Sequence, residues 1–191
     1  MELNSSRRHL VGRPPTIDRD RVLDLAEGIL LKAGTGALTL DAVAKAAGIS
    51  KGGVQSRFGT KDELIGAMIE RWSREYDAQL NAIVGPDPQA EEAVRGHVEA
   101  TMGMDAGGRT RAAGLMAALI ESSHHRAECR AWYAERFGAL DPRSKQGQRA
   151  RMALLATEGA FILRTFGLME FSDDEWSGVR DGLRALLDGK I

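Results

Sequence analysis

Residues 50–57 bring together side chains that suit contact with a polyanion. Lys51 can reach a phosphate or the edge of a guanine, and Gln55 can offer a bidentate amide to adenine. Between them lie Gly52 and Gly53, each of which costs a helix about 1 kcal/mol relative to Ala. A backbone that approaches DNA closely would explain that cost. These residue types at this spacing therefore predict a short helix that reads DNA.

The elements that would position this segment are two short helices, over 40–47 and 51–58. Thr39 and Ser50 are good N-caps for them, and Gly48 can take the positive φ of the tight turn between them. This arrangement is a helix-turn-helix, in which the second helix lies in the major groove of DNA. The alternative is a pair of ordinary surface helices, of which the second begins weakly.

The spacing of apolar residues predicts an all-α fold of about nine helices in total. No run alternates with a period of two over enough residues to favour a strand. Capping boxes are expected at Thr60–Glu63 and Ser172–Glu175, and breaks at Gly34 and at Gly107–Gly108. Apart from the two short helices, the expected helices span 18–33, 61–83, 89–104, 110–124, 126–139, 145–167 and 173–188.

Charge is unevenly distributed along this chain of 191 residues. Residues 1–61 hold ten Lys and Arg against six Asp and Glu, whereas residues 62–191 hold sixteen against twenty-one. A basic head on an acidic body favours contact of the head with a polyanion. The single cysteine, Cys129, fits a reducing compartment, and no apolar run approaches the ~20 residues that span a bilayer. A cytoplasmic protein without a membrane partner is therefore expected.

The span 12–72 resembles the N-terminal domain of the tetracycline-repressor (TetR) family of transcriptional regulators. The residues that carry this resemblance are Gly12-Arg-Pro14, Ala33-Gly34, Leu38–Ala44, Ala47–Gly52, Phe58 and Lys61–Leu64. The resemblance implies a homodimer that binds a near-palindromic operator in double-stranded DNA. It also implies a C-terminal domain in which a small-molecule effector lowers the affinity for DNA. One departure is Gln55, where the family commonly has an aromatic residue, often Tyr, that contacts a DNA phosphate.

By this resemblance the chain divides into four parts. They are a flexible basic arm (1–15), a helix-turn-helix DNA-binding domain (16–60), a connecting helix (61–84) and a ligand-binding and dimerisation domain (85–191). The connecting helix is expected to be the only element that joins the head to the body. The predicted DNA contacts are Arg13, Thr39, Ser50, Lys51, Gly53, Gln55, Ser56 and Lys61.

The body is expected to enclose a mainly apolar cavity with a few polar groups. The predicted ligand contacts are His97, Met102, Met116, Glu121, His124, Trp132, Phe161 and Arg164. Apolar residues at such spacing can equally form the core. Small residues at helical spacing predict a dimer interface of Gly147, Ala150, Leu154, Thr157, Phe161, Leu183 and Leu187. Packing within one chain is the alternative explanation of that stripe.

No catalytic pattern points to an enzyme, and no cofactor is predicted. The chain lacks a Gly-x-Ser-x-Gly elbow, a Walker loop and a His-Glu-x-x-His pair. His124, His125 and Cys129 are close in sequence, but nothing in their spacing supplies the convergent ligands that a metal ion needs. The stretch 122–130 is expected to be a polar connection, and no metal site is predicted. The alternatives to a ligand-released repressor are an all-α enzyme and a DNA-binding protein without a ligand.

Replacing Lys51 by Ala should weaken operator binding and make it less sensitive to salt. A lysine on a phosphate releases one counterion, so its loss should reduce the slope of log affinity against log salt concentration by about 1. A salt titration of operator affinity for the wild-type and variant proteins measures this slope. An unchanged affinity across the titration would remove Lys51 from the set of DNA contacts.

Overall fold

The computed structural model describes residues 18–191, which form nine α-helices and no strand. The all-α prediction is confirmed. No helix among the described residues is both long and apolar enough to cross a lipid bilayer. The predicted arm over 1–15, with Arg13, lies outside the described residues. The helices are α1 (Arg19–Ala37), α2 (Leu40–Ala47), α3 (Lys51–Phe58), α4 (Lys61–Val84), α5 (Ala90–Met102), α6 (Ala106–Glu121), α7 (Ser123–Phe137), α8 (Lys145–Thr165) and α9 (Asp173–Leu187).

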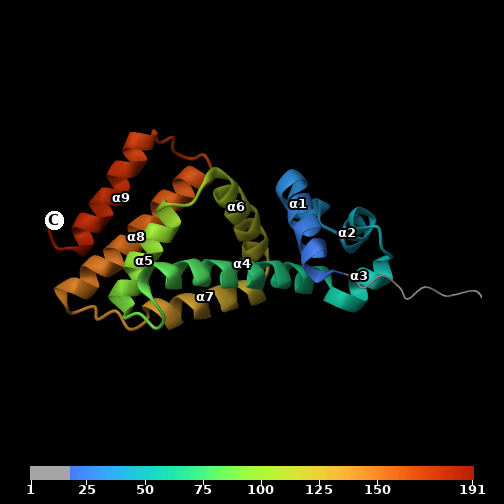
Figure 1. Ribbon diagram of the computed structural model, residues 1–191, viewed down its shortest axis with the longest axis horizontal. Helices are drawn as coiled ribbons and strands as arrows, with labels where there is room; N and C mark the ends of the chain where they lie inside the picture. The colour runs from blue at the N-terminus through green and yellow to red at the C-terminus, as the bar shows by residue number, and fades with distance from the viewer. Residues whose placement is uncertain (1–17) are drawn as a thin grey trace, which may run out of the picture.

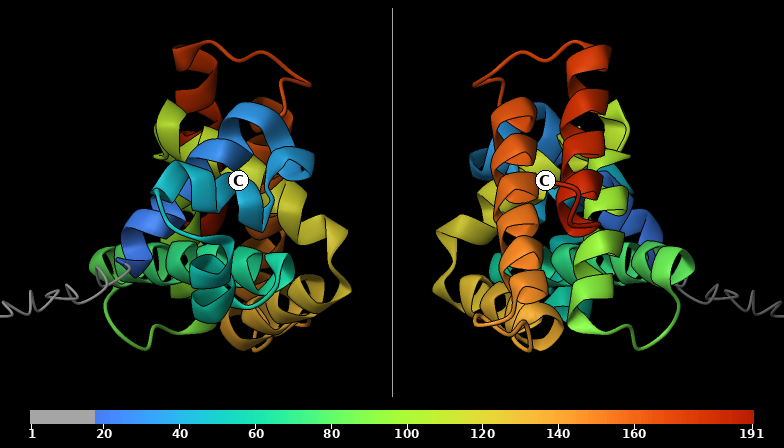
Figure 2. Two further views of the ribbon diagram at one scale, coloured as in Figure 1. Left: turned by 90° about the vertical axis from the view of Figure 1, so that its right-hand side faces the viewer. Right: turned by 90° about the vertical axis from the view of Figure 1, so that its left-hand side faces the viewer.

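The molecule is elongated, with a head of α1–α3 at one end and a body of α5–α9 at the other (Figure 1). The long helix α4 leaves the head directly after α3 and runs beneath the body, where α7 lies alongside it. Helices α8 and α9 lie side by side at the end of the molecule that is farthest from the head (Figure 2). The head is therefore held at one end of α4, and the α8–α9 pair closes the opposite end.

Most helices begin at a residue whose side chain satisfies the N–H groups of the first turn. These N-caps are Asp18, Thr39, Ser50, Thr60, Asp105, Ser122, Ser144 and Ser172. Each such cap contributes about 1 kcal/mol of helix stability. The two predicted capping boxes, at Thr60–Glu63 and Ser172–Glu175, are present. These local signals explain why the bounds of α2 and α3 agree with the predicted ones.

The break predicted at Gly107–Gly108 is wrong, because both glycines lie in the first turn of α6. A carboxylate oxygen of Asp105 accepts a hydrogen bond of 2.7 Å from the Gly108 N–H, and this cap starts the helix despite the glycines. The polar connection predicted over 122–130 is also wrong. Ser122 alone links the two helices, since it ends α6 and its hydroxyl caps α7.

One of the three hydrophobic clusters among the described residues joins the head to α4 and to helix α6 of the body. Residues of α1–α3 pack with the first turns of α4 and also with Leu115 and Ala118 of α6. The Thr35 hydroxyl, near the end of α1, donates a hydrogen bond of 2.7 Å to the Glu121 carboxylate of α6. Helix α4 is therefore not the only element that joins the head to the body, because α6 reaches the head from a different part of the chain.

A buried carboxylate at this junction binds three helices together. Glu27 of α1 has a side chain that is 11% exposed, and its two oxygens accept hydrogen bonds from two arginines, with Arg111 reaching both oxygens. The Arg71 guanidinium of α4 lies 2.7 Å from one oxygen, and the Arg111 guanidinium of α6 lies 2.8 Å from the other. Arg71 also pairs with Asp24, and Arg111 with Glu75. We call these five charged residues the Glu27 hub.

Replacing Glu27 by Gln should strongly destabilise the protein. Two guanidinium groups would lose their shared counter-charge in a poorly solvated place, so the free energy of unfolding should fall by about 3 kcal/mol. Asp24→Asn is the matched control, because Asp24 also binds Arg71 but is 70% exposed, and its loss should cost less than about 1 kcal/mol. Urea unfolding followed by circular dichroism measures both values. Equal losses for the two variants would contradict the importance of burial at Glu27.

Candidate functional sites: the head and the cavity

Helices α2 and α3 form a compact pair with an apolar inner side and a polar outer side. Val43 and Ala44 of α2 and Val54 and Phe58 of α3 are buried. The turn between the helices depends on Gly48, whose φ of 66° is a left-handed conformation that favours glycine. On the outer side, the predicted DNA contacts on α3 stand exposed or half-buried, as do the two caps: Thr39, Ser50, Lys51, Gly53, Gln55 and Ser56.

Two lysines of the predicted contact set have partners within the chain. The Lys51 ammonium lies 2.9 Å from the Asp41 carboxylate of α2, and both side chains are more than half exposed. Such an exposed ion pair stabilises little and can be exchanged for a phosphate. The Lys61 ammonium donates a hydrogen bond of 2.6 Å to the Thr35 carbonyl of α1. Lys61 is therefore partly engaged in fixing the end of α1.

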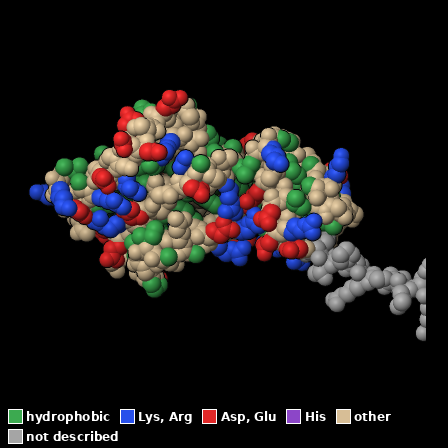
Figure 3. Space-filling view, turned by 45° about the horizontal axis from the view of Figure 1, so that its top comes forward, with side chains coloured by type: hydrophobic (Ala, Val, Ile, Leu, Met, Phe, Trp, Pro, Cys, Tyr) green, Lys and Arg blue, Asp and Glu red, His purple; other side chains and the backbone are tan. Residues whose placement is uncertain are grey.

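Gly52 has no packing reason to be a glycine. A side-chain Cβ built at this position would have the Ser50 hydroxyl oxygen, 4.0 Å away, as its nearest neighbour. Acidic and basic side chains are intermingled on the face seen in Figure 3, so the head shows no patch of a single sign there. Contacts within the described chain therefore do not explain why this helical position is a glycine. The absence of a side chain here leaves the backbone open to close approach by an external partner.

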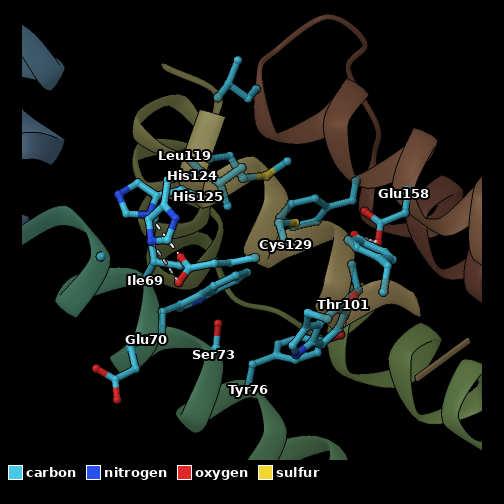
Figure 4. Close-up of a pocket in the computed structure, with 18 of the residues that line it drawn as sticks. Ile69, Glu70, Ser73, Tyr76, Thr101, Leu119, His124, His125, Cys129 and Glu158 are labelled. Carbon is cyan, nitrogen blue, oxygen red and sulfur yellow. Dashed lines mark hydrogen bonds and ion pairs between the residues drawn. The ribbon is translucent and has the colours of Figure 1, made fainter. Parts of the chain in front are cut away.

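The body holds a cavity of about 530 Å³ that is bounded by α4, α5, α6, α7 and α8. Apolar and aromatic side chains form most of its wall, with polar groups concentrated at two ends (Figure 4). The lining residues are Asp62, Glu63, Gly66, Ile69, Glu70, Trp72, Ser73, Tyr76, His97, Thr101, Met104, Met116, Leu119, Ile120, His124, His125, Glu128, Cys129, Trp132, Tyr133, Glu158 and Phe161.

Five of the eight predicted ligand contacts lie on this wall: His97, Met116, His124, Trp132 and Phe161. The other three are engaged elsewhere. Met102 is buried in the core, where its carbonyl accepts a hydrogen bond of 2.8 Å from the Trp176 indole. Glu121 binds Thr35. The Arg164 guanidinium lies 4.3 Å from the centre of the Trp176 ring and 3.6 Å from Asp173.

One end of the cavity is a chain of polar side chains around Glu158. The Tyr76 hydroxyl lies 2.8 Å from His97 Nδ1 and 2.9 Å from the Thr101 hydroxyl. On the other side of the ring, His97 Nε2 lies 2.8 Å from Glu158 Oε1. The Tyr133 hydroxyl donates a hydrogen bond of 2.5 Å to the same oxygen. Helices α4, α5, α7 and α8 are thereby tied together at this end.

This network keeps Glu158 ionised. Burial opposes the charge of Glu158, but interaction with His97 and the hydrogen bond from Tyr133 outweigh it, so the pKa of this carboxyl lies below its usual range. Burial, together with the charge of Glu158, raises the pKa values of both the Tyr76 and Tyr133 hydroxyls. Both phenols are therefore neutral near pH 7, and the end of the cavity carries a carboxylate held by neutral donors and an imidazole.

The opposite end is built from the first turns of α4 and α7. His125 is 2% exposed, and its Nε2 lies 3.2 Å from the Asp62 carbonyl. Its ring fits against Gly66, where a Cβ would lie only 3.1 Å from His125 Cε1. Ligand atoms of His124, His125 and Glu128 lie within 4.8 Å of one another. The two histidines thus converge with Glu128, and Cys129 lies between the two ends (Figure 4).

The largest part of the wall that sequence reasoning missed belongs to α4. Ile69, Trp72, Ser73 and Tyr76 have the i, i+3, i+4, i+7 spacing of one helix face and line the cavity together. That spacing was visible in the sequence, but it is equally typical of a core stripe. Whether this stripe lines a cavity or belongs to a closed core depends on how α4 packs against four other helices, and no local pattern specifies that packing.

The residues of the predicted dimer interface are used within the chain. Gly147, Ala150, Leu154, Thr157, Phe161 and Leu183 are buried, and Leu187 is partly buried. The reason is that this side of α8 packs against α5 and α9. At Gly147, an added Cβ would lie 2.1 Å from the Asp141 carbonyl oxygen. The side of α8 that faces outward carries a different apolar set, with Met152 59%, Leu155 62% and Ile162 36% exposed.

The helix-turn-helix head and the cavity-containing helical body define the class of DNA-binding transcriptional regulators. The protein-family model described as "Bacterial regulatory proteins, tetR family" matches residues 22–68. The model described as "Tetracyclin repressor-like, C-terminal domain" matches residues 91–188. Together the two family models cover the head and most of the body. The chain belongs to the tetR family of bacterial regulatory proteins.

Solved structures of transcriptional regulators share the fold. A transcriptional regulator from Rhodococcus sp. Rha1 is 19% identical, with a TM-score of 0.66, and the match covers 90% of this chain and 97% of that one. A TetR-like regulator from the same strain is 23% identical (TM-score 0.62; 93% and 98% covered). A TetR-family regulator from Streptomyces coelicolor is 20% identical (TM-score 0.55; 91% and 100% covered). No curated protein matches the sequence.

Proposed function

We propose that this chain is a homodimeric repressor that leaves its operator when a small-molecule effector binds in the cavity. The observation that carries the proposal is the double use of α4 and α6. Both helices line the cavity, through Trp72 and Tyr76 on α4 and Met116 and Leu119 on α6. The same two helices hold the head, because they supply the arginines that bind Glu27. A change in cavity width therefore changes the support of the head.

The proposed contact with DNA is made by α3 in the major groove. Lys51, Gln55 and Ser56 are the side chains that would reach bases and phosphates, and Gly52 lets the backbone come close. Two heads of a dimer would enter successive major grooves about 34 Å apart. Thr39 and Ser50 stand at helix N-termini, where backbone N–H groups favour phosphate.

The proposed release mechanism is a shift between two arrangements of the head. Without effector, the Glu27 hub holds α1 against α4 and α6 in the arrangement that fits DNA. An effector that prefers a wider cavity separates α4 from α6, and Glu27 cannot then keep both arginines at hydrogen-bond distance. The population moves to the arrangement with the larger affinity for effector and the smaller affinity for operator.

The proposed dimer forms through the outward side of α8, together with α9. Met152 and Leu155 lie about one helical turn apart on that side, and Ile162 lies about two turns further on, so that apolar surface is in contact with water. Gly159 between them has open space around its Cα, so a second helix can approach closely. This surface lies at the end of the molecule opposite the head (Figure 2), so a partner seated on it leaves α3 uncovered.

Selection from a random DNA pool should recover a near-palindrome whose half-sites are about 34 Å apart.

Compounds can then be screened by thermal unfolding. An effector at a hundred times its Kd should stabilise the protein by about 2.7 kcal/mol and raise Tm by roughly 5–10 °C. The same compound should lower operator affinity. If every compound that raises Tm leaves operator affinity unchanged, release by an effector is contradicted. If the selection recovers a single half-site, the dimer is contradicted.

Leu155→Glu should convert the dimer to a monomer and lower operator affinity by about tenfold or more, because paired heads bind with increased effective concentration. Sedimentation velocity measures the oligomeric state, and fluorescence anisotropy measures the affinity. Ile83→Glu is the matched control, because Ile83 is 43% exposed on α4 and lies outside the outward side of α8. A dimeric Leu155→Glu protein with full operator affinity would contradict this interface.

A further inference from the structure

The ionisable side chains on the cavity wall are mostly acidic. Among the described residues, the lining contains no lysine and no arginine. It contains three histidines and five carboxylates. The carboxylates therefore outnumber even fully protonated imidazoles. They are Asp62, Glu63, Glu70, Glu128 and Glu158.

Four of these acids lie at two depths in the cavity. The side chains of Asp62, Glu70 and Glu128 are 55%, 62% and 56% exposed, so they lie at the rim. The Glu158 side chain is 22% exposed and lies inside, at the end that Tyr76 and Thr101 share (Figure 4). Glu70 is paired with Arg19 at 3.7 Å, so the negative charge that an entering cation meets at the rim comes chiefly from Asp62 and Glu128. The cation meets negative charge again at the inner end, from Glu158. This arrangement steers positive ligands inward.

Glu158 has one oxygen available for a ligand. Both hydrogen bonds that this carboxylate receives from described residues, from His97 and from Tyr133, involve Oε1. Its lowered pKa keeps it charged near neutral pH. Its field extends into the cavity, since burial and the charge of Glu158 together raise the pKa of the Cys129 thiol. Oε2 can thus face a positive ligand without any loss of internal hydrogen bonds.

Aromatic rings surround the same end. Trp132 lies 5.1 Å from Tyr133 and 5.9 Å from Tyr76, measured between ring centroids. Phe161 follows Glu158 by almost one turn of α8 and also lines the cavity. The faces of such rings attract cations, most strongly where water is excluded, and the Arg136 guanidinium already lies over the Trp132 ring, 4.3 Å from its centroid. The remaining wall is apolar, which suits a hydrocarbon or aromatic body attached to the charge.

We propose that the effector of this chain is a lipophilic organic cation of the ammonium class, with its charge between Glu158 and the rings of Tyr76, Trp132 and Tyr133. This proposal rests on the proposed function of the cavity as the effector site. A volume of about 530 Å³ accepts one such molecule with an aromatic or alkyl body. A carboxylate would place its negative charge among the carboxylates of the described lining, which holds no lysine or arginine to bind it.

Three probes of one skeleton test the sign of the charge on the full-length wild-type protein. They are a phenylalkyl trimethylammonium, its neutral isostere with carbon in place of nitrogen, and the matching phenylalkyl carboxylate. Trp72 and Trp132 line the cavity and report binding by fluorescence. The ammonium should bind about tenfold more tightly than the isostere, and the carboxylate more weakly than the isostere. A carboxylate that binds as tightly as the ammonium, or an ammonium that fails to bind, overturns the proposal.

Glu158→Gln tests the position of the charge. The variant should lose the approximately tenfold preference for ammonium over isostere. The affinity for the neutral isostere should stay unchanged, which shows that the cavity is still folded. Glu170→Gln removes the same charge from an exposed residue outside the cavity lining, and it should keep the preference. A preference that survives in Glu158→Gln overturns the assignment of this carboxylate.

Operator affinity, measured with and without the ammonium probe, separates this proposal from the proposed function. Selective binding with a fall in operator affinity supports both. Selective binding with unchanged operator affinity supports the cation site and contradicts effector release. Tight binding of the carboxylate with a fall in operator affinity supports release and overturns the cation site.

Discussion

The position of the head depends on a single buried carboxylate. Glu27 lies on α1, and its two oxygens bind arginines that come from α4 and α6. A buried charge of this kind is costly to leave unpaired, so the three helices are stable together only when both contacts are made. The apolar core around it holds the same elements, but apolar contacts tolerate small displacements that these three directed hydrogen bonds do not. The hub therefore gives the junction a preferred geometry as well as stability.

The cavity inherits its shape from the same helices. Its floor is α4, and α6 forms one wall, so the space left for a ligand and the support of the head are two aspects of one packing arrangement. At the far end, the polar chain from Tyr76 through His97 to Glu158 ties α4 and α5 to α8. The outward apolar side of α8 lies beyond that chain. Ligand, head and proposed dimer surface thus meet through a few helices instead of through flexible loops.

The sequence allowed the head to be predicted well because its signals are local. Thr39, Gly48 and Ser50 determine where α2 and α3 begin and end, and caps act within one turn. The same reasoning failed at Gly107–Gly108, where the Asp105 cap outweighs two glycines. The site in the body was only partly predictable. Which of Met102 or Met116 faces the cavity depends on how α5 and α6 are rotated in the bundle, and that rotation results from contacts between residues far apart in sequence.

The link between α6 and α7 imposes a constraint on how this chain can change. Ser122 ends one helix and caps the next, so the connection is one residue long. Each residue of an α-helix turns its side chains by about 100°. An insertion or deletion at this point would rotate all of α7 relative to α6, which would carry His125 away from Gly66 and Cys129 and Trp132 away from the cavity. Substitutions that keep a capping hydroxyl or carboxylate are compatible with this corner, whereas a change in its length is not.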